Sequence, residues 1–231
     1  MKTIGIVGGL AWPSSITTYR TINQLVEQRA GGGHCARMIF VQTDFADIER
    51  MQAAGDWEGV GRQIARSATK LKLAGADFYI VACNTVHTAA AYFVEEVDLP
   101  FIHIVDPCGE AIKARGLRTV GLMGTGYTMN GSYFKDRLGE KYGLKVITPE
   151  EPFATAIDRA LFQELTREII RDDTREGLKE AMTSLTDRGA EAVILGCTEL
   201  GLALSQKDCC VPLLDTTVEQ AKAAVEFAFA E

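Results

Sequence analysis

The chain has 231 residues, of which 47% are apolar and 24% charged, a composition typical of a folded globular protein. This length fits one large domain or two small ones. The net charge of −7 argues against nucleic acid as a partner, because phosphate contacts require clustered Lys and Arg.

The opening stretch MKTIGIVGGL is too short in its apolar part for a secretory signal and is expected to form the first strand. No stretch approaches the ~20 apolar residues that span a bilayer, so no membrane partner is expected. The six cysteines, at positions 35, 83, 108, 197, 209 and 210, include no CxxC pair, which argues against a zinc ribbon or a disulfide framework. We therefore expect a cytoplasmic protein with reduced thiols and no bound metal.

Short apolar runs alternate along the chain with stretches of helical periodicity. The expected strands are Thr3–Val7, Met38–Gln42, Phe78–Ala82, Phe101–Ile104, Thr119–Met123, Lys145–Thr148, Ala192–Leu195 and Val211–Leu214. The expected helices are Ser15–Ala30, Trp57–Ala74, Val86–Val97, Gly109–Arg115, Met129–Tyr142, Ala156–Arg171, Thr174–Arg188 and Thr217–Phe229. This alternation predicts right-handed βαβ units and a parallel sheet covered on both faces.

The second half of the chain repeats the first. KTIGIVG from Lys2 matches RTVGLMG from Arg118, and AGADFYIVACNT from Ala74 matches RGAEAVILGCTE from Arg188. A third match, LPFI with VPLL, keeps the same order at nearly the same offset. We therefore predict an α/β protein made of two similar halves, related by a pseudo-twofold axis and packed together without a linker.

Cys83 and Cys197 each follow a predicted strand of this repeat. Ligands bind beyond the carboxyl ends of parallel strands, and a helix start at the same place favours a thiolate or a bound carboxylate. A pseudo-twofold axis would bring the two thiols to opposite sides of a small anion, where one removes a proton from carbon and the other delivers one. The alternative is that each cysteine is a buried small hydrophobic residue, which leaves the duplicated context unexplained.

The segments GGLAWPSS, ACNTVH, GLMGTGYTM and GCTE resemble the aspartate/glutamate racemase family, whose members need no pyridoxal phosphate. The resemblance runs in order over essentially the whole chain. It implies two doubly wound parallel-sheet domains, residues 1–104 plus 212–231 and residues 105–211, with the active site in the cleft between them. It also implies a homodimer and no cofactor.

The same resemblance implies the roles of individual residues. Cys83 and Cys197 match the acid/base pair, one serving each enantiomer of the substrate. The implied substrate-binding residues are Ser14, Gln52, Asn84, Thr85, Thr125 and Thr198. Some relatives bind the distal carboxylate of the substrate with basic residues that this chain lacks, and Arg50 and Arg159 are the available substitutes.

Other polar residues near the motifs have two interpretations each. His87 orients the thiol, binds zinc or contacts the backbone. We favour the backbone contact over zinc, because structural zinc cysteines come in close pairs. Trp12 shapes a substrate loop or packs on the neighbouring helix. Asp106 and Glu199 hold the substrate amine or make cap and hinge hydrogen bonds.

The predicted function is cofactor-independent racemisation of aspartate or glutamate, an isomerase reaction on a small amino acid. One alternative is a related isomerase or decarboxylase acting on a dicarboxylate or a hydantoin. The presence of both cysteines counts against a decarboxylase. A two-lobed small-ligand binding protein is the alternative outside the enzymes.

Overall fold

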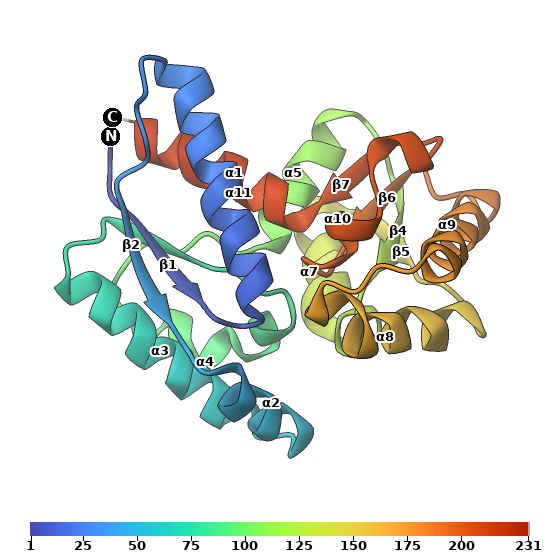
Figure 1. The fold of residues 1–231 in the computed structure, drawn as a ribbon, viewed down its shortest axis with the longest axis horizontal. Helices are drawn as coiled ribbons and strands as arrows, with labels where there is room; N and C mark the ends of the chain where they lie inside the picture. Colours follow the sequence, from blue (N-terminus) through green and yellow to red (C-terminus); the bar gives the residue numbers. More distant parts are fainter. Residues whose placement is uncertain (231) are drawn as a thin grey trace. The chain divides into compact units, whose positions relative to one another are not determined.

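The computed structural model describes residues 1–230, and the chain divides into two compact α/β units (Figure 1). Unit 1 comprises Met1–Ile104 together with the C-terminal segment from Thr217, and unit 2 comprises Val105–Thr216. Each unit is built on its own parallel sheet, which confirms the predicted fold class of two similar α/β halves.

Unit 1 has a three-stranded parallel sheet in the order β2-β1-β3. Its strands are β1 (Ile4–Gly8), β2 (Met38–Gln42) and β3 (Phe78–Val81). Its helices are α1 (Trp12–Ala30), α2 (Phe45–Ala53), α3 (Trp57–Leu73), the 3-10 helix η1 (Thr85–Ala89), α4 (Ala91–Val94) and α11 (Thr216–Phe229). Lys2 N–H donates to Ala228 O at 2.7 Å, so the first residues lie beside the end of α11.

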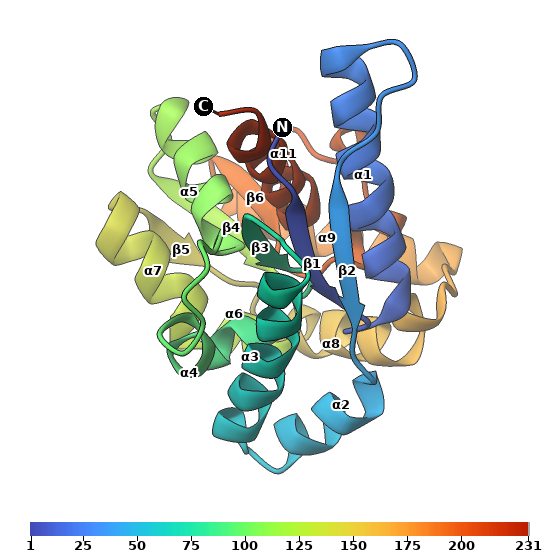
Figure 2. The ribbon, with the colours of Figure 1, turned by 90° about the vertical axis from the view of Figure 1, so that its left-hand side faces the viewer.

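Helices pack on both faces of this sheet, as expected from its largely apolar strands. Alternate strand residues such as Val7 and Val81 join α2, α3 and α4 in one core cluster. The residues between them, such as Ile6 and Ile80, join α1 and α11 in a second cluster. Figure 2 shows α3 and α1 on the two sides of β1 and β2.

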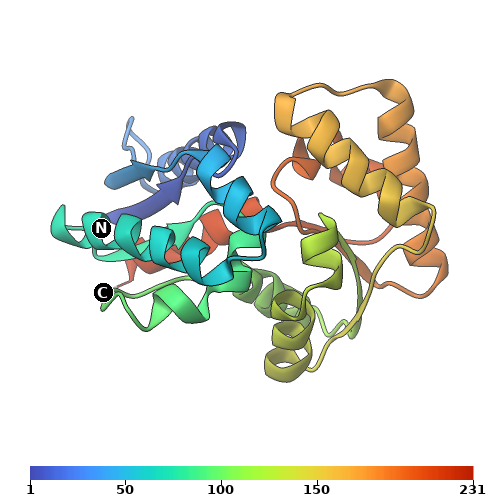
Figure 3. The same ribbon diagram turned by 90° about the horizontal axis from the view of Figure 1, so that it is seen from below.

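Unit 2 has a four-stranded parallel sheet in the order β5-β4-β6-β7. Its strands are β4 (Thr119–Met123), β5 (Lys145–Ile147), β6 (Ala192–Leu195) and β7 (Leu213–Asp215). Its helices are α5 (Val105–Ala114), α6 (Gly126–Asn130), α7 (Ser132–Tyr142), α8 (Phe153–Gln163), η2 (Leu165–Arg167), α9 (Asp172–Asp187), α10 (Leu200–Ala203) and η3 (Gln206–Asp208). Residues of α8, α9 and α10 form one core cluster on β4 and β6, and Figure 3 shows α8 and α9, in gold and orange, packed together.

The internal repeat extends to individual backbone hydrogen bonds. In unit 1, Tyr79 N–H donates to Pro100 O at 2.9 Å, and in unit 2 Val193 N–H donates to Pro212 O at 2.9 Å. The two proline positions are those of the LPFI and VPLL match. The two halves therefore share hydrogen-bond register as well as sequence pattern.

A carboxylate is repeated at the start of the third strand of each half. Asp77 Oδ2 accepts the backbone N–H of Thr3 at 2.6 Å, and Glu191 Oε2 accepts the backbone N–H of Thr119 at 2.8 Å. Each carboxylate satisfies a strand-end donor that has no ladder partner at that point. The Asp-to-Glu difference between the halves preserves this contact.

Three sequence expectations are corrected by the structure. The boundary expected after residue 211 lies after Thr216, because β7 pairs with β6 and so belongs to unit 2. The expected strand Phe101–Ile104 is reduced to a single parallel bridge between Tyr79 and Phe101, because α5 begins at Val105. The expected helix Val86–Val97 is split into η1 and α4.

Within residues 1–230, no helix has both the length and the apolar character that a membrane span requires.

Candidate active site

In unit 1, Cys83 lies at the carboxyl end of β3. Ala82 N–H donates to Val7 O at 2.9 Å and so prolongs the pairing with β1 by one residue, after which Cys83 N–H turns back to Val81 O. The Cys83 side chain is half-buried, while Asn84 and Thr85 are 3% and 9% exposed. The turn thus presents a thiol next to two buried polar side chains at the edge of the sheet where ligands bind.

His87 supports this turn from behind. Its Nδ1 lies 2.8 Å from Cys83 O, and its Nε2 accepts the Ile104 backbone N–H at 3.3 Å. A nitrogen that accepts a hydrogen bond carries no hydrogen, so Nδ1 bears the proton and donates to Cys83 O. Both ring nitrogens therefore contact the backbone, which agrees with the backbone interpretation of His87. Within residues 1–230 no group of three or more His, Cys, Asp or Glu side chains is placed to hold a metal ion.

In unit 2, Cys197 lies at the carboxyl end of β6, in the position that repeats Cys83. Gly196 N–H donates to Met123 O at 2.6 Å, and Cys197 itself is half-buried. The Cys197 Sγ donates to Glu199 Oε2 at 2.9 Å. The Thr198 hydroxyl donates to the same oxygen, also at 2.9 Å. The turn therefore groups a thiol, a hydroxyl and a carboxylate on three successive residues.

The Glu199 carboxylate is 4% exposed and makes no cap hydrogen bond to α10. The cap interpretation of Glu199 is therefore wrong, since its side chain turns back toward Cys197. Asp106, the other carboxylate considered for the substrate amine, accepts hydrogen bonds from Arg137 Nε at 2.6 Å, from Arg137 Nη2 at 2.8 Å and from Lys141 Nζ at 2.9 Å. This hydrogen bonding raises the pKa of the Arg137 guanidinium and links α5 to α7.

Thr125 lies at the same edge of the unit 2 sheet as Cys197. Met123 and Leu195 are paired in the register of β4 with β6, and Thr125 and Cys197 each follow two residues later. Thr125 is buried and caps α6 by accepting the Thr128 backbone N–H at 3.3 Å. The neighbouring strands therefore bring two of the predicted site residues to one edge.

The first loop of unit 1 is folded tightly against β2. Gly9 has a φ of 75°, and its N–H donates to Ser15 Oγ at 2.9 Å. A Cβ at Gly9 would collide with the backbone of Thr43, so only glycine fits there. Ser14 is 2% exposed in the first turn of α1. Trp12 is 55% exposed and lines a pocket together with Ile16 and Tyr19 of α1 and Phe40 of β2.

Gln52 lies near the end of α2, a helix that the sequence pattern did not predict. Its side chain is 8% exposed, and its Nε2 has no hydrogen-bond partner within residues 1–230. A buried amide donor without a partner costs about 1–3 kcal/mol. Gln52 is therefore the site residue whose hydrogen-bonding capacity is most plainly left for a ligand.

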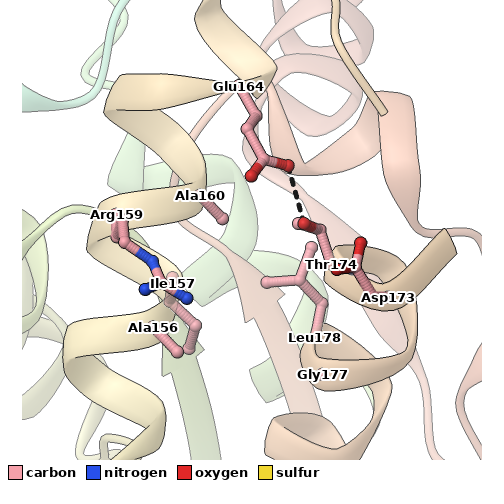
Figure 4. A pocket seen from close by; sticks show the side chains of 9 residues that line it. All are labelled: Ala156, Ile157, Arg159, Ala160, Glu164, Asp173, Thr174, Gly177 and Leu178. Atoms are coloured by element: carbon pink, nitrogen blue, oxygen red, sulfur yellow. Dashed lines mark hydrogen bonds between the residues drawn. The ribbon is translucent and has the colours of Figure 1, made fainter. Parts of the chain in front are cut away.

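The two substitutes for the missing basic residues are placed elsewhere. Arg50 pairs with Asp47 at 3.0 Å on the exposed side of α2. Arg159 lines a cavity of about 150 Å³ between α8 and α9, where Thr174 donates to Glu164 at 2.6 Å. Figure 4 shows Arg159 on α8 and Thr174 on α9 among the residues that line this cavity. No predicted site residue lines it, so a role for Arg159 in substrate binding receives no support from its surroundings.

Among the similar solved structures, the following two cover the whole chain. A Yersinia pestis protein provisionally assigned as an Asp/Glu racemase is 38% identical, covers 100% of both chains and gives a TM-score of 0.93. An aspartate racemase homologue from Pyrococcus horikoshii OT3 is 30% identical over 100% of both chains, with a TM-score of 0.87. The fold and its length are therefore shared with proteins of this group.

Among curated proteins, a glutamate racemase from Clostridium perfringens is 32% identical over 126 residues, which are 54% of this chain and 46% of the relative. The chain thus spans about half the length of the curated relatives it matches. The sequence profile described as Asp/Glu/Hydantoin racemase matches residues 7–224. This chain belongs to the Asp/Glu/Hydantoin racemase family.

Proposed function

We propose that this protein racemises an amino acid, with aspartate and glutamate as the first substrates to test, by proton transfer at Cα between two thiols. The observation that carries the proposal is the duplicated turn, in which Cys83 and Cys197 each follow the third strand of a repeated sheet. Core packing gives no reason to repeat a cysteine followed by buried polar residues. Membership of the family and the names of its relatives support the reaction class.

The proposed chemistry uses one thiol from each unit on opposite faces of the same carbon. One cysteine, as thiolate, removes the Cα proton, and the other, as thiol, delivers a proton to the opposite face. The intermediate carries extra negative charge on the substrate carboxylate. Asn84, Thr85 and Thr198 supply side-chain donors against this charge, and preorganised donors of this kind stabilise such transition states strongly. No step requires a cofactor or a metal.

Thr125, Ser14 and Gln52 complete the proposed binding site. Thr125 lies at the same sheet edge as Cys197, and Ser14 follows the tightly folded first loop. Gln52 offers the unpartnered amide described above. In this assignment all six substrate contacts are neutral side chains, and the backbone donors at the two turns add to them.

A related isomerase or decarboxylase on a dicarboxylate or hydantoin is the second candidate, because the family description itself includes hydantoin. A decarboxylase replaces the carboxylate by one proton and needs one thiol as donor. The duplicated thiols favour racemisation, since two opposed acid/base groups are what inversion at carbon requires.

The test is incubation of the protein in D₂O with L- and D-aspartate, L- and D-glutamate and a panel of other amino acids and hydantoins. Proton NMR follows loss of the Cα signal, and chiral chromatography follows inversion. Exchange with inversion supports racemisation, and release of carbon dioxide indicates the decarboxylase. Tight binding without exchange contradicts both and favours a binding protein.

We also propose a cytoplasmic homodimer. Within residues 1–230 no cysteine forms a disulfide, which is the state that a reducing compartment favours. Light scattering coupled to size-exclusion chromatography measures the mass in solution directly, and a mass near the 25.1 kDa of one chain would contradict the dimer.

A further inference from the structure

The turn after β6 contains a buried acid whose role the proposed reaction leaves open. Glu199 is 4% exposed, and its Oε2 accepts both the Cys197 thiol and the Thr198 hydroxyl at 2.9 Å. An ionised carboxylate has only acceptor oxygens, and Cys197 Sγ is the donor in its contact with Glu199. The hydrogen in the sulfur–oxygen contact therefore resides on Cys197.

We infer that Glu199 is a positioning residue that keeps Cys197 in the thiol form and so makes it the resting acid of the proposed pair. Ionising Cys197 would break its hydrogen bond and place two negative charges 2.9 Å apart, and a like charge at that distance disfavours the charged form. In this assignment Cys83 is the residue that is a thiolate at rest and acts as the base. This inference rests on the proposed racemisation for its catalytic meaning.

The sequence repeat shows that only one of the two cysteine turns carries this carboxylate. The residue two positions after Cys197 is Glu199, whereas the residue two positions after Cys83 is Thr85. A threonine hydroxyl at that position brings no negative charge to oppose a thiolate. The two halves match in strand register and in the cysteine but differ in the residue that sets the protonation of the thiol.

This assignment determines which cysteine holds a proton at each stage of the reaction. In the resting enzyme the Cys83 proton has been released to water, and Cys197 holds its own. During the first turnover Cys83 takes the Cα proton and becomes a thiol, while the Cys197 proton passes to the opposite face of the carbon. Cys197 is left as a thiolate beside Glu199. The resting state returns when Cys83 releases its new proton to water and Cys197 takes one from water, or when Cys197 takes the Cα proton of a substrate of the opposite hand and Cys83 delivers its own.

The experiment measures thiol reactivity and does not depend on turnover. Wild type and Glu199→Gln are treated with iodoacetamide at neutral pH, and alkylation of Cys197 and Cys83 is quantified by peptide mass spectrometry. Only the thiolate reacts, so removing the charge should raise the Cys197 rate about tenfold, the equivalent of one pKa unit. The rate of alkylation of Cys83, quantified in the same peptide digest, should not change. Glu176→Gln neutralises an exposed carboxylate of the same unit and should alter neither rate.

Glu199→Asp provides a second test that keeps the charge but withdraws it from the sulfur. Its Cys197 rate should lie between those of wild type and Glu199→Gln, and thermal unfolding followed by circular dichroism confirms that each variant is folded. An unchanged or slower Cys197 rate in the folded variants overturns the inference. If the rates change as expected but no amino acid is racemised, the effect of Glu199 on Cys197 stands and the proposed function fails.

Discussion

Replacing His87 with Ala is expected to destabilise the protein by several kcal/mol, although His87 contacts no substrate in the proposed mechanism. The imidazole is 1% exposed and satisfies two buried backbone groups, the Cys83 carbonyl and the Ile104 N–H. Leaving a buried polar group without a partner costs about 1–3 kcal/mol, so the two groups together cost about 2–6 kcal/mol. The whole stability of a typical domain is about 5–15 kcal/mol, so this loss is large.

Two further substitutions separate the hydrogen bonds from the packing of the ring. His87 stacks on Phe101 with ring centroids 5.6 Å apart and lies edge-on to Phe93 at 6.5 Å. His87→Phe keeps an aromatic ring in this cluster but loses both hydrogen bonds, so most of the loss should persist. His87→Gln offers one donor and one acceptor and should recover part of it.

The assay is urea unfolding at neutral pH of the wild type and the three variants, followed by far-ultraviolet circular dichroism. The expected order of stability is wild type, Gln, Phe, Ala. A loss below about 1 kcal/mol in both the Ala and Phe variants would refute the reasoning, because two unsatisfied buried groups cannot cost so little. A Gln variant no better than Phe would show that the ring, and not its nitrogens, supplies the stability.

Three other predictions follow from the site and the sheet ends. Cys83→Ala and Cys197→Ala should each lower the rate of racemisation in both directions by at least about 10²-fold, because each turnover needs both groups, while Cys35→Ala, at an exposed thiol, should be neutral in the same chiral assay. Gln52→Leu removes a buried amide without a partner, so it should leave the free energy of unfolding unchanged or raise it by about 1 kcal/mol. The same substitution should raise KM, because the amide is proposed to bind the substrate. A loss of stability would mean that the amide has a partner. Backbone hydrogen bonds from Thr119 and Arg118 hold the pKa of Glu191 below its ordinary value of 4.5. The contribution of Glu191 to stability is therefore complete above pH 4.5 and is lost as the pH falls through the lowered pKa. In unfolding measurements at a series of pH values, Glu191→Gln should reduce the loss of stability at acid pH.

The strands were predictable because most are short apolar runs, and β1, β3 and β6 are buried along their whole length. Seven of the eight expected strands correspond to β1–β7, with ends displaced by at most two residues. The repeat strengthened these assignments, since a pattern found twice at a nearly constant offset has to satisfy the same pairing twice. The paired hydrogen bonds to Pro100 and Pro212 show this at atomic level.

The missed elements are those whose sequences carry little apolar periodicity. Helix α2 buries only Ile48 and Gln52, too few positions to define a helical face, although Asp44 caps its start. Helix α10 is a single turn after the Cys197 motif. The expected strand after residue 100 was lost for the opposite reason. Its apolar residues pack in the core, but only Phe101 pairs with Tyr79 before α5 begins.

Sequence motifs located the candidate site, but they could not assign the contacts within it. The positions of Cys83 and Cys197 at strand ends follow from the pattern of each half. Whether Glu199 caps α10 or turns toward the thiol depends on side-chain rotation, and both alternatives have the same sequence. The structure selects the second, with sulfur and oxygen 2.9 Å apart.

Comparison of the two halves shows how a duplicated fold can make its two thiols chemically different. Two identical halves would give two equivalent thiols, and nothing would determine which of them rests as the acid. The strand register and the cysteine are kept in both halves, so the geometry of the turn is preserved. The charge two residues later is not kept, because Glu199 stands opposite Thr85 in the repeat. One substitution outside the sheets is therefore sufficient to distinguish the two thiols without disturbing the fold that presents them.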